Sequence, residues 1–328
     1  MHANMVQAGE RLLVECGAPW LSRIFSEACG IALQPGTVGD PDVHLVITDD
    51  ASPFTQKGWD PLTRGAYHRA GNLMLINACG SGFDLRITVG PCVSHAKIRV
   101  EARFRPPPKE RAAALALRSR FHLLTRAVLL QYPALWVAGT RGRMPLHAAG
   151  LQTDAGVILL AGPAGVGRST MLLQALDDNG RACSDNLSVS DGRAVHGLVE
   201  PVRIEATGGR RMPHGRGERD LPNRADVLIP DRVVVLRRAD RRVPVVRLIT
   251  PMRAADVLTA GTYMAGELRR YWAFAGTLAL ATGRGPACPR IAEVANTFAR
   301  LPAVEVTLGD RPCPSLVELL GAPERVAL

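Results

Sequence analysis

Residues 96–104 show a regular alternation of apolar and polar side chains. Apolar residues occupy every second position and charged residues occupy the positions between them: Ile98, Val100, Ala102 and Phe104 against Lys97, Arg99, Glu101 and Arg103. Because successive side chains of a strand point to opposite faces, this period of two predicts a strand with one buried face. Short apolar runs at 43–48 and 73–77, each bounded by turn residues, predict further strands. We interpret residues 1–105 as a smaller N-terminal α+β domain that is mostly β.

Three consecutive prolines at 106–108 follow, and a stiff segment of this kind is typical of a boundary between structural units. Beyond them, apolar residues recur at spacings of three and four: Leu117, Phe121, Leu124 and Val128. That spacing predicts an amphipathic helix over residues 109–132. We assign residues 106–134 to a linker and this connecting helix, which we expect to dock through its apolar face.

From residue 135 onward, strand-like and helical segments alternate, which is typical of an α/β core. The predicted strands cover residues 157–161, 233–236 and 304–308, and the predicted helices cover residues 169–177, 291–300 and 316–320. Residues 207–224 are rich in glycine, arginine and proline, which predicts an exposed, mobile loop. We assign residues 135–328 to one α/β domain.

The composition is that of a globular protein. Of the 328 residues, 47% are hydrophobic and 21% are charged, a length and balance that favour two structural units with a sizeable core. The longest apolar runs fall far short of the roughly 18 to 20 residues that span a bilayer. Because Glu10, Arg11 and Glu15 interrupt the apolar N-terminal segment, we expect no signal peptide, no membrane span and a cytoplasmic location. The seven cysteines and eight histidines show neither C-x-x-C nor H-x-x-x-H spacing, which argues against a disulfide framework and a structural metal.

The formal net charge of +10 comes almost entirely from arginine, since Lys57, Lys97 and Lys109 are the only lysines. A positive charge favours acidic or polyanionic partners. Aromatic residues make up only 5% of the chain and do not interleave with the basic clusters, so a stacking surface for single-stranded nucleic acid is poorly supported. Nucleic-acid binding is therefore the weakest functional hypothesis, because it rests on charge alone.

Residues 162–170 read Gly-Pro-Ala-Gly-Val-Gly-Arg-Ser-Thr and match the pattern G-x-x-x-x-G-[KR]-[ST] between a predicted strand and a predicted helix. Glycines let the backbone curl so that successive N–H groups surround phosphate oxygens, and the start of the helix adds its positive dipole end. The pattern thus predicts a loop that binds a nucleoside triphosphate, formed by Gly162, Ala164, Gly165, Val166, Gly167, Arg168, Ser169 and Thr170. The alternative is a glycine-rich strand-to-helix turn without a ligand.

Two positions of this loop carry specific chemical expectations. Ser169 stands where the pattern places a hydroxyl ligand of Mg²⁺. Arg168 stands where the pattern usually has lysine. Arginine keeps the positive charge and can fork onto phosphate oxygens, but its group is longer and planar. It could therefore bind phosphate and still miss the bridge between the β- and γ-phosphates at the transition state.

Two short segments flank the loop: residues 146–149, Leu-His-Ala-Ala, and residues 182–186, Ala-Cys-Ser-Asp-Asn. The interval from Thr170 to Ser184 fits one helix and a return to the next strand, which would place Asp185 beside the loop. A carboxylate near the γ-phosphate and an attacking hydroxyl would serve as general base. The alternatives are a solvated turn for Asp185 and a satisfied core position for His147.

Together, the segments "LHAAGL", "LLAGPAGVGRST" and "ACSDN" resemble the C-terminal domain of HPr kinase/phosphorylase and its relatives, which include kinases that phosphorylate hydroxyls on ribosomal peptides. The resemblance covers roughly residues 137–328. It implies an α/β fold with a P-loop HPr-kinase-like core, and ATP and Mg²⁺ as cofactors. It also implies that Asp185 is the general base and His147 the catalytic histidine of the preceding strand.

The resemblance places Asn186 where a second aspartate usually helps to hold the metal, so the implied metal ligands are Ser169, Asp185 and Asn186. Asparagine can ligate through its carbonyl oxygen, but it brings no negative charge. The family's long HPr-recognition signature is absent, which argues against a true HPr kinase with phosphorylase activity. Arg210 and Arg211 weakly resemble a basic hairpin near the nucleotide and are candidate substrate contacts, the alternative being a solvated basic loop.

Two hypotheses of different classes follow from these residues. The leading one is an ATP- and Mg²⁺-dependent kinase that phosphorylates a hydroxyl of a peptide, a protein or a small metabolite, with a tailoring role on a ribosomal peptide implied by the resemblance alone. The other is a catalytically weak or inactive nucleotide-binding sensor or scaffold, supported by the departures at Arg168 and Asn186. The sequence leaves open the acceptor, the choice of ATP or GTP, and whether the chain forms a homo-oligomer.

Overall fold

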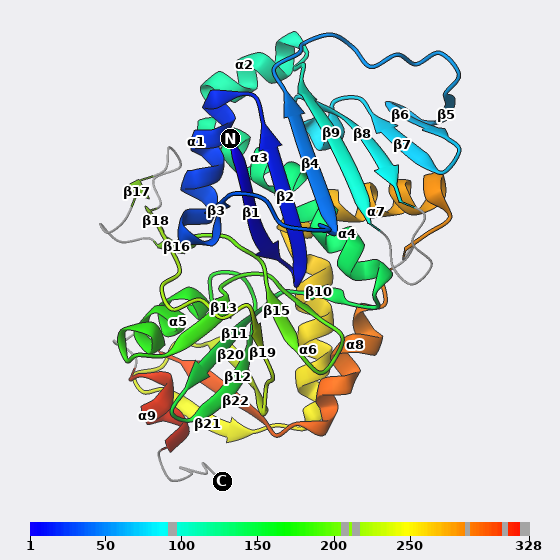
Figure 1. Ribbon diagram of the computed structural model, residues 1–328. Helices are drawn as coiled ribbons and strands as arrows, with labels where there is room; N and C mark the ends of the chain where they lie inside the picture. Colours follow the sequence, from blue (N-terminus) through cyan, green and yellow to red (C-terminus); the bar gives the residue numbers. More distant parts are fainter. Residues whose placement is uncertain (91–96, 205–209, 212–216, 286–288, 310–313, 322–328) are drawn as a thin grey trace. The chain divides into compact units, whose positions relative to one another are not determined.

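The computed structural model describes residues 1–90, 97–204, 210–211, 217–285, 289–309 and 314–321. The chain divides into two compact units (Figure 1). Unit 1 contains residues 1–142, 211–216 and 269–289, and unit 2 contains residues 143–210, 217–268 and 290–328. The sequence-based limits of the domains, 1–105, 106–134 and 135–328, remain a prediction.

A nine-stranded sheet forms the centre of unit 1. Its strands, in chain order, are β1 (His2–Gln7), β2 (Glu10–Cys16), β3 (Gln34–Pro35), β4 (Val43–Thr48), β5 (Asp60–Thr63), β6 (Ala66–Arg69), β7 (Asn72–Leu75), β8 (Phe83–Val89) and β9 (Ile98–Phe104). Their spatial order is β3-β1-β2-β4-β9-β8-β7-β6-β5. β4 is parallel to both β2 and β9, and the other pairs are antiparallel. These strands all fall within residues 1–105, and Ile98, Val100 and Ala102 are buried as the alternation predicts.

The helices of unit 1 correct the prediction of one helix over residues 109–132. They are α1 (Pro19–Cys29), α2 (Pro108–Ala116), α3 (Arg118–Arg126), a π-helical segment (Ala127–Gln131), α4 (Tyr132–Thr140) and α7 (Arg269–Thr282). The chain breaks at Leu117, whose φ of −120° and ψ of 59° are not helical, and helical structure then continues to Thr140. No residue of α2 is buried, so packing does not hold α2 in line with α3. By contrast, α4 is buried from Tyr132 to Gly139 and packs against β2, β4 and β9.

A mixed six-stranded sheet forms the centre of unit 2, in the order β13-β11-β12-β20-β22-β21. Its strands are β11 (Ala148–Thr153), β12 (Gly156–Ala161), β13 (Arg181–Ser184), β20 (Arg232–Arg238), β21 (Val245–Leu248) and β22 (Ala303–Leu308). β12, β20 and β22 are parallel, whereas β11 is antiparallel to both β12 and β13. The three strands predicted in this part of the chain therefore lie side by side.

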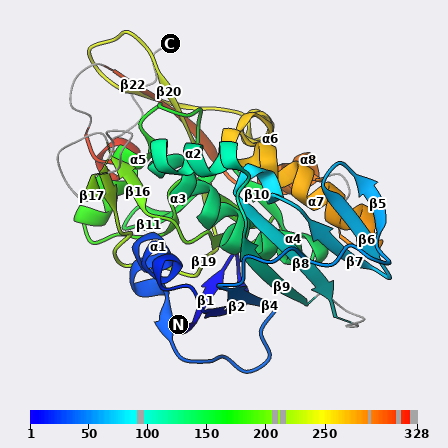
Figure 2. The same ribbon diagram turned by 90° about the horizontal axis from the view of Figure 1, so that it is seen from above.

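Helices cover both faces of this sheet (Figures 1 and 2). α5 (Arg168–Asp177) and α9 (Leu316–Gly321) bury apolar residues in the same core cluster as β12, β20 and β22. α6 (Pro251–Met264) packs against β12 and β20, and α8 (Ile291–Thr297) packs against α6. A sheet with helices on both faces is the mixed α/β architecture that the sequence predicts. Among the described residues, no helix is long and apolar enough to cross a membrane.

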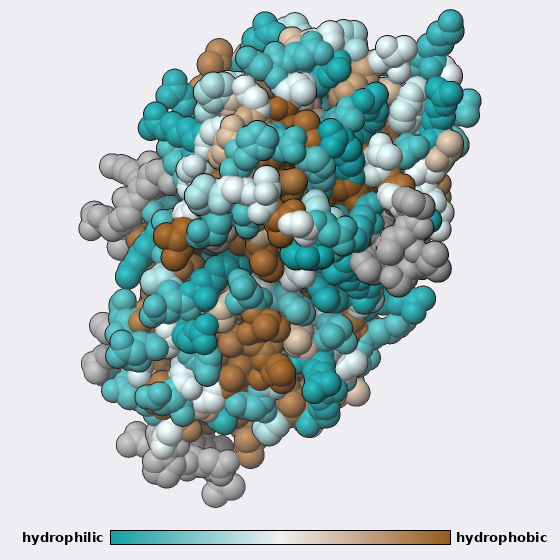
Figure 3. All heavy atoms as spheres, in the orientation of Figure 1, coloured by the Kyte–Doolittle hydropathy of each residue, from teal (hydrophilic) through white to brown (hydrophobic). Residues whose placement is uncertain are grey.

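Shorter strands complete unit 2. β10 (Met144–Leu146), β14 (Ser188–Ser190), β15 (Val195–Gly197) and β19 (Val227–Leu228) form an antiparallel four-stranded sheet. β16 (Val202–Ile204) pairs with β18 (Gly217–Arg219), and β17 (Arg210–Arg211) is a two-residue strand. Hydrophilic side chains dominate the surface seen in Figure 3, and an apolar group lies over the region of β15 and β19. Two exposed apolar residues of this region are Val227 and Ile229.

The pairing of β11 with β13 contains a bulge. Gly150 is opposite Ser184, but its neighbour Leu151 is opposite Ala182, so Cys183 is the extra residue. A Cβ atom built on Gly150 would lie 2.3 Å from the Cys183 sulfur. Only glycine therefore leaves room for the buried Cys183 side chain at this position.

Candidate active site

One edge of the six-stranded sheet collects the sequence-predicted site residues of unit 2. β12 and β13 both end at this edge, and β11, which runs antiparallel to them, begins there. The predicted phosphate loop therefore follows β12, Asp185 follows β13, and His147 precedes β11. The side chains of the predicted substrate residues Arg210 and Arg211 lie outside what the structure describes.

The strand, loop and helix predicted around residues 157–170 are present, with β12 ending at Ala161 and α5 beginning at Arg168. Gly162, Gly165 and Gly167 have positive φ angles of 152°, 78° and 113°, a region that favours glycine. A Cβ atom on Gly162 would lie 2.9 Å from the Leu236 carbonyl oxygen. Val166 is buried in the core cluster of unit 2 and anchors the loop to it, whereas Ala164 and Thr170 are exposed. The loop thus has a glycine-dependent backbone and an exposed rim.

Arg168 points into the protein. Its side chain donates from Nη1 to the His147 carbonyl oxygen at 2.8 Å and from Nη2 to Asn186 Oδ1 at 3.0 Å. Nη2 also lies 2.6 Å from His147 Nε2. Only 7% of Arg168 is exposed, and burial lowers the pKa of its guanidinium despite the nearby Asp185 carboxylate. The charge at the lysine position of the motif is therefore already surrounded by acceptors from the residue before β11 and from the segment after β13.

His147 is a neutral residue in this environment. Burial, followed by the charge of Arg168, lowers the pKa of its imidazole to about 4. His147 Nε2 lies 2.6 Å from Arg168 Nη2, which can only donate, and 3.1 Å from Asn186 Oδ1, which can only accept. The shorter contact favours an unprotonated Nε2 and a proton on Nδ1. Nδ1 is buried and has no hydrogen-bond acceptor among the described residues. The His147 backbone N–H donates to Thr262 Oγ1 of α6 at 2.9 Å, which fixes the start of β11.

Asp185 lies directly beside the start of α5. Ser169 Oγ donates to Asp185 Oδ2 at 2.8 Å, so the hydroxyl and the carboxylate predicted to share a metal are in contact. Only 5% of Asp185 is exposed, and its second oxygen, Oδ1, has no hydrogen-bond donor among the described residues. Burial raises the pKa of this carboxyl group, while the hydrogen bond from Ser169 and the charge of Arg168 oppose that rise. A buried carboxylate with one unpaired oxygen is suited to bind a cation or accept a proton.

These oxygens fit Mg²⁺ better than a softer metal. In the described part of the chain, no group of three or more His, Cys, Asp or Glu side chains is placed to hold a metal ion. Mg²⁺ is commonly held by one or two carboxylates, with water and substrate phosphates as the other ligands. The Ser169 hydroxyl and the Asp185 carboxylate, which are in contact, provide such a partial set. Asn186 differs, because its Oδ1 accepts a hydrogen bond from Arg168.

Several neighbours of the site have no sequence signature. Arg203 of β16 makes an ion pair with Glu267 at 3.6 Å, and its charge opposes the rise that burial causes in the pKa of Asp185. Glu267 belongs to the 3-10 turn Gly266–Leu268, about eighty residues from Asp185. Although burial acts in the opposite direction, the pKa of Glu267 is lowered by its backbone hydrogen bond, then by the charge of Arg203, and last by the Asn186 side chain. Since only the tertiary fold brings these residues together, no local pattern could have identified them.

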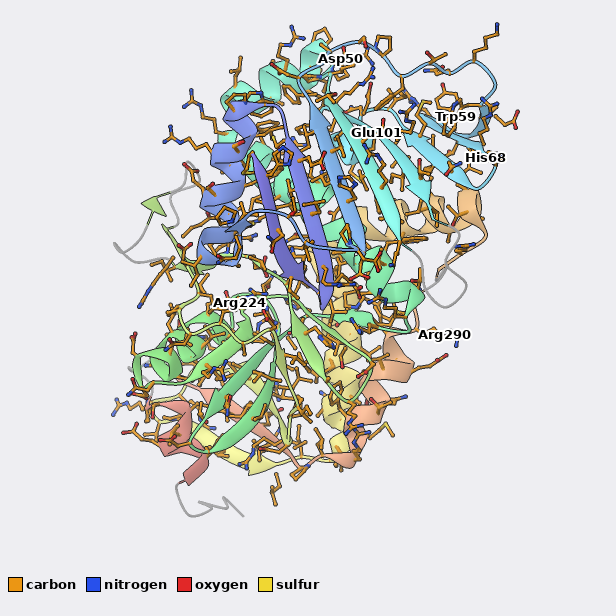
Figure 4. All side chains as sticks on the ribbon, in the orientation of Figure 1. Asp50, Trp59, His68, Glu101, Arg224 and Arg290 are labelled. Atoms are coloured by element: carbon orange, nitrogen blue, oxygen red, sulfur yellow. The ribbon has the colours of Figure 1, made fainter. Side chains whose placement is uncertain are left out.

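The loop predicted over residues 207–224 is only partly an exposed loop. Residues 207–209 and 212–216 lie outside the described residues, but Gly217, Glu218 and Leu221 are buried. Arg219 makes an ion pair with Asp177 at 3.6 Å. Arg224, labelled in Figure 4, donates to the carbonyl oxygens of Gly197 and Leu198 at 3.1 Å each. The prediction of an exposed loop is therefore wrong for Gly217, Glu218 and Leu221, while Arg224 holds the end of β15.

Comparison with known proteins yields a distant likeness. No protein-family model and no curated protein matches the chain. Among solved structures, it is similar to the HPr(Ser) kinase/phosphatase from Coxiella burnetii, with 18% sequence identity and a TM-score of 0.24. The match covers 33% of this chain and 72% of that protein.

Proposed function

We propose that the protein is an ATP- and Mg²⁺-dependent phosphotransferase that phosphorylates a hydroxyl group. The observation that carries this proposal is the contact between Ser169 and Asp185, 2.8 Å apart at the start of the helix after a glycine-rich loop. In this proposal the backbone N–H groups of the loop bind the phosphates, the Ser169 hydroxyl binds a metal, and the Asp185 carboxylate accepts a proton. Phosphoryl transfer depends mainly on such positioning and charge neutralisation.

Each residue has a distinct role in this reaction. The loop from Gly162 to Gly167 binds the phosphates through its backbone, and α5 adds its positive N-terminal end. Ser169 and Asp185 Oδ2 would hold Mg²⁺, which neutralises charge on the phosphates when it is bound. Asp185 Oδ1 accepts the proton of the attacking hydroxyl. Asn186 is the third candidate ligand and would first have to release Arg168.

His147 acts by position in this proposal. With a pKa of about 4 it is uncharged at neutral pH, so it neither donates a proton nor attracts phosphate as a cation. Its carbonyl oxygen and Nε2 both accept from Arg168, while its backbone N–H is fixed by Thr262. His147 therefore keeps the start of β11 and the start of α5 in a constant relation beside Asp185.

The acceptor is proposed as a peptide, a protein or a small metabolite that carries a hydroxyl. The three sequence segments that resemble HPr-kinase-like enzymes favour a tailoring kinase of ribosomal peptides within this class. Location in the cytoplasm and the assignment of Arg210 and Arg211 to acceptor binding are part of the same proposal. Basic side chains there would suit an acidic acceptor.

A second candidate is a nucleotide-binding sensor or scaffold without turnover. The engagement of Arg168 by His147 and Asn186 favours it, because the lysine position of the motif then contributes no free cation to the loop. Such a protein would still bind nucleotide through backbone N–H groups. Binding and turnover must therefore be measured separately.

The test uses the full chain with radiolabelled ATP, Mg²⁺ and hydroxyl-bearing peptides. The kinase proposal predicts phosphate transfer or ATP turnover that Asp185→Asn reduces by about a hundredfold or more, with nucleotide binding retained. Asp178→Asn, at an exposed position after the same helix, is the control and should keep full activity. Binding without turnover in the unmodified protein would support the sensor, and absence of nucleotide binding would refute both proposals.

A further inference from the structure

The phosphate loop has a second cation beside it, contributed by another strand. β20 runs parallel to β12, with Val235 opposite Ala161, the last residue of β12. Residues 236–238 therefore continue past the end of β12 alongside the loop. The Leu236 carbonyl oxygen lies next to Gly162, and Arg238 Nη2 lies 3.6 Å from the position of a Cβ atom on Gly167. Arg238 thus reaches the end of the loop from which α5 begins.

Alternation along β20 separates Arg238 from its neighbour Arg237. Val234 and Leu236 belong to the core cluster shared with α5, and Arg238, two residues after Leu236, is on the same face of the strand. Arg237 is on the opposite face and makes an ion pair with Glu305 at 3.6 Å. Arg238 is exposed, and it has no ion pair or hydrogen bond within the described part of the chain. Two adjacent arginines of the same strand therefore have different environments, and one of them is at the loop.

A second cation matters at this loop because the guanidinium of Arg168 is already engaged. Its two Nη atoms are occupied by the His147 carbonyl oxygen, His147 Nε2 and Asn186 Oδ1. A nucleoside triphosphate carries several negative charges, and backbone dipoles alone neutralise them only in part. An exposed guanidinium can form two parallel charge-assisted hydrogen bonds to phosphate oxygens.

We infer that Arg238 is the phosphate-binding cation of this loop, taking the task that Arg168 leaves unfilled. The ligand is the β-phosphate or the γ-phosphate of a nucleoside di- or triphosphate, bound by the Arg238 guanidinium above Gly167. This inference rests on the proposed binding of nucleotide, but it does not depend on turnover. It also gives a reason why the strand beside β12 ends in a basic residue that is directed at the loop.

The test is isothermal titration calorimetry of ATP, ADP and AMP, with Mg²⁺ present, on the full chain and three variants. Arg238→Gln should weaken ATP and ADP binding by about tenfold or more, since a charge-assisted hydrogen bond is lost, and should leave AMP binding nearly unchanged. Arg238→Lys should restore part of the affinity. Arg237→Gln is the matched control and should bind all three nucleotides like the unmodified protein, because Glu305 keeps its ion pair with Arg247 at 2.6 Å.

The inference would be overturned if Arg238→Gln bound ATP like the unmodified protein, or if both glutamine variants weakened it equally. Equal weakening of ATP and AMP would also overturn it, because the contact would then be to the nucleoside. Loss of folding is not expected at an exposed position, and an unchanged thermal unfolding midpoint checks this. If the unmodified protein bound none of the nucleotides, the proposed function itself would fail, which is a separate outcome.

Discussion

Arg168 Nη2 lies 2.6 Å from His147 Nε2, so the charged group at the end of the glycine-rich loop donates to a neutral imidazole. The contact orients the imidazole and the guanidinium at the same time. It also explains why arginine suits this position, since three acceptors surround it and lysine has one nitrogen.

Replacement of Arg168 by lysine should therefore destabilise the protein. A single ammonium group can satisfy only part of the acceptor set formed by His147 and Asn186, and the unsatisfied buried acceptors should cost about 2 kcal/mol in the free energy of unfolding. Urea unfolding measures this cost. Arg181→Lys, at the exposed start of β13, is the control with no expected effect. A lysine variant as stable as the unmodified protein would show that the contacts of Arg168 contribute little.

Stability should depend on pH through His147. The pKa of this imidazole is lowered from 6.5 to about 4 in the folded state, so between these values the unfolded chain binds a proton that the folded chain does not. The free energy of unfolding should consequently fall by up to about 3 kcal/mol as the pH decreases from 6.5 to 4. His147→Gln keeps an acceptor for Arg168 and should reduce this slope, whereas the exposed His2→Gln should not. The check is the difference in urea midpoint between pH 7 and pH 4.5 for each variant.

Turnover, where it occurs, should require the ionised form of Asp185. Burial raises the pKa of this carboxyl above its ordinary value of 3.8, so the fraction of active base grows as the pH rises through that raised pKa. A plot of kcat/KM against pH should thus show an acidic limb with a midpoint above 3.8. Asp178→Asn should retain the same limb. A rate that is already maximal at the lowest pH where the protein stays folded would exclude Asp185 as the base.

The backbone of the loop should tolerate no side chain at its first glycine. Gly162 has a φ of 152°, and an added Cβ atom would lie 2.9 Å from the Leu236 carbonyl oxygen. Gly162→Ala should therefore lower the free energy of unfolding by about 1 to 3 kcal/mol and weaken ATP binding. Gly266→Ala is the control, because open space surrounds Gly266. Urea unfolding measures the loss of stability, and calorimetry measures the loss of ATP affinity. If Gly162→Ala and Gly266→Ala had the same stability and the same ATP affinity, the predicted clash would be contradicted.

Periodicity and spacing identified the local elements of unit 2 well. The strands around residues 158, 234 and 306 and the helix after Arg168 agree with the apolar runs and with the glycine-rich motif between them. The order of neighbouring strands was not predictable in the same way. It depends on pairing between distant segments, such as that of β12 with β20, and a short stretch of sequence does not indicate its partner.

The candidate residues were harder to interpret than the elements. The spacing around Asp185 correctly indicated a place beside the loop, and the structure shows its contact with Ser169. The sequence did not indicate that Arg168 turns inward, because its acceptors belong to two other segments. Arg237 and Arg238 were indistinguishable as a basic pair, since their different surroundings come from the alternation of β20 and from Glu305.

The extra residue in β13 has a consequence for the segment that carries the carboxylate. Cys183 is inserted opposite Gly150, two residues before Asp185, and a bulge bends the strand that contains it. Gly150 leaves the space that the Cys183 sulfur fills, since an added Cβ atom would lie 2.3 Å from that sulfur. A larger residue at position 150 would therefore displace Cys183, and with it the short segment that leads to Asp185 and its contact with Ser169. A missing side chain on β11 thus helps to determine where the carboxylate can act.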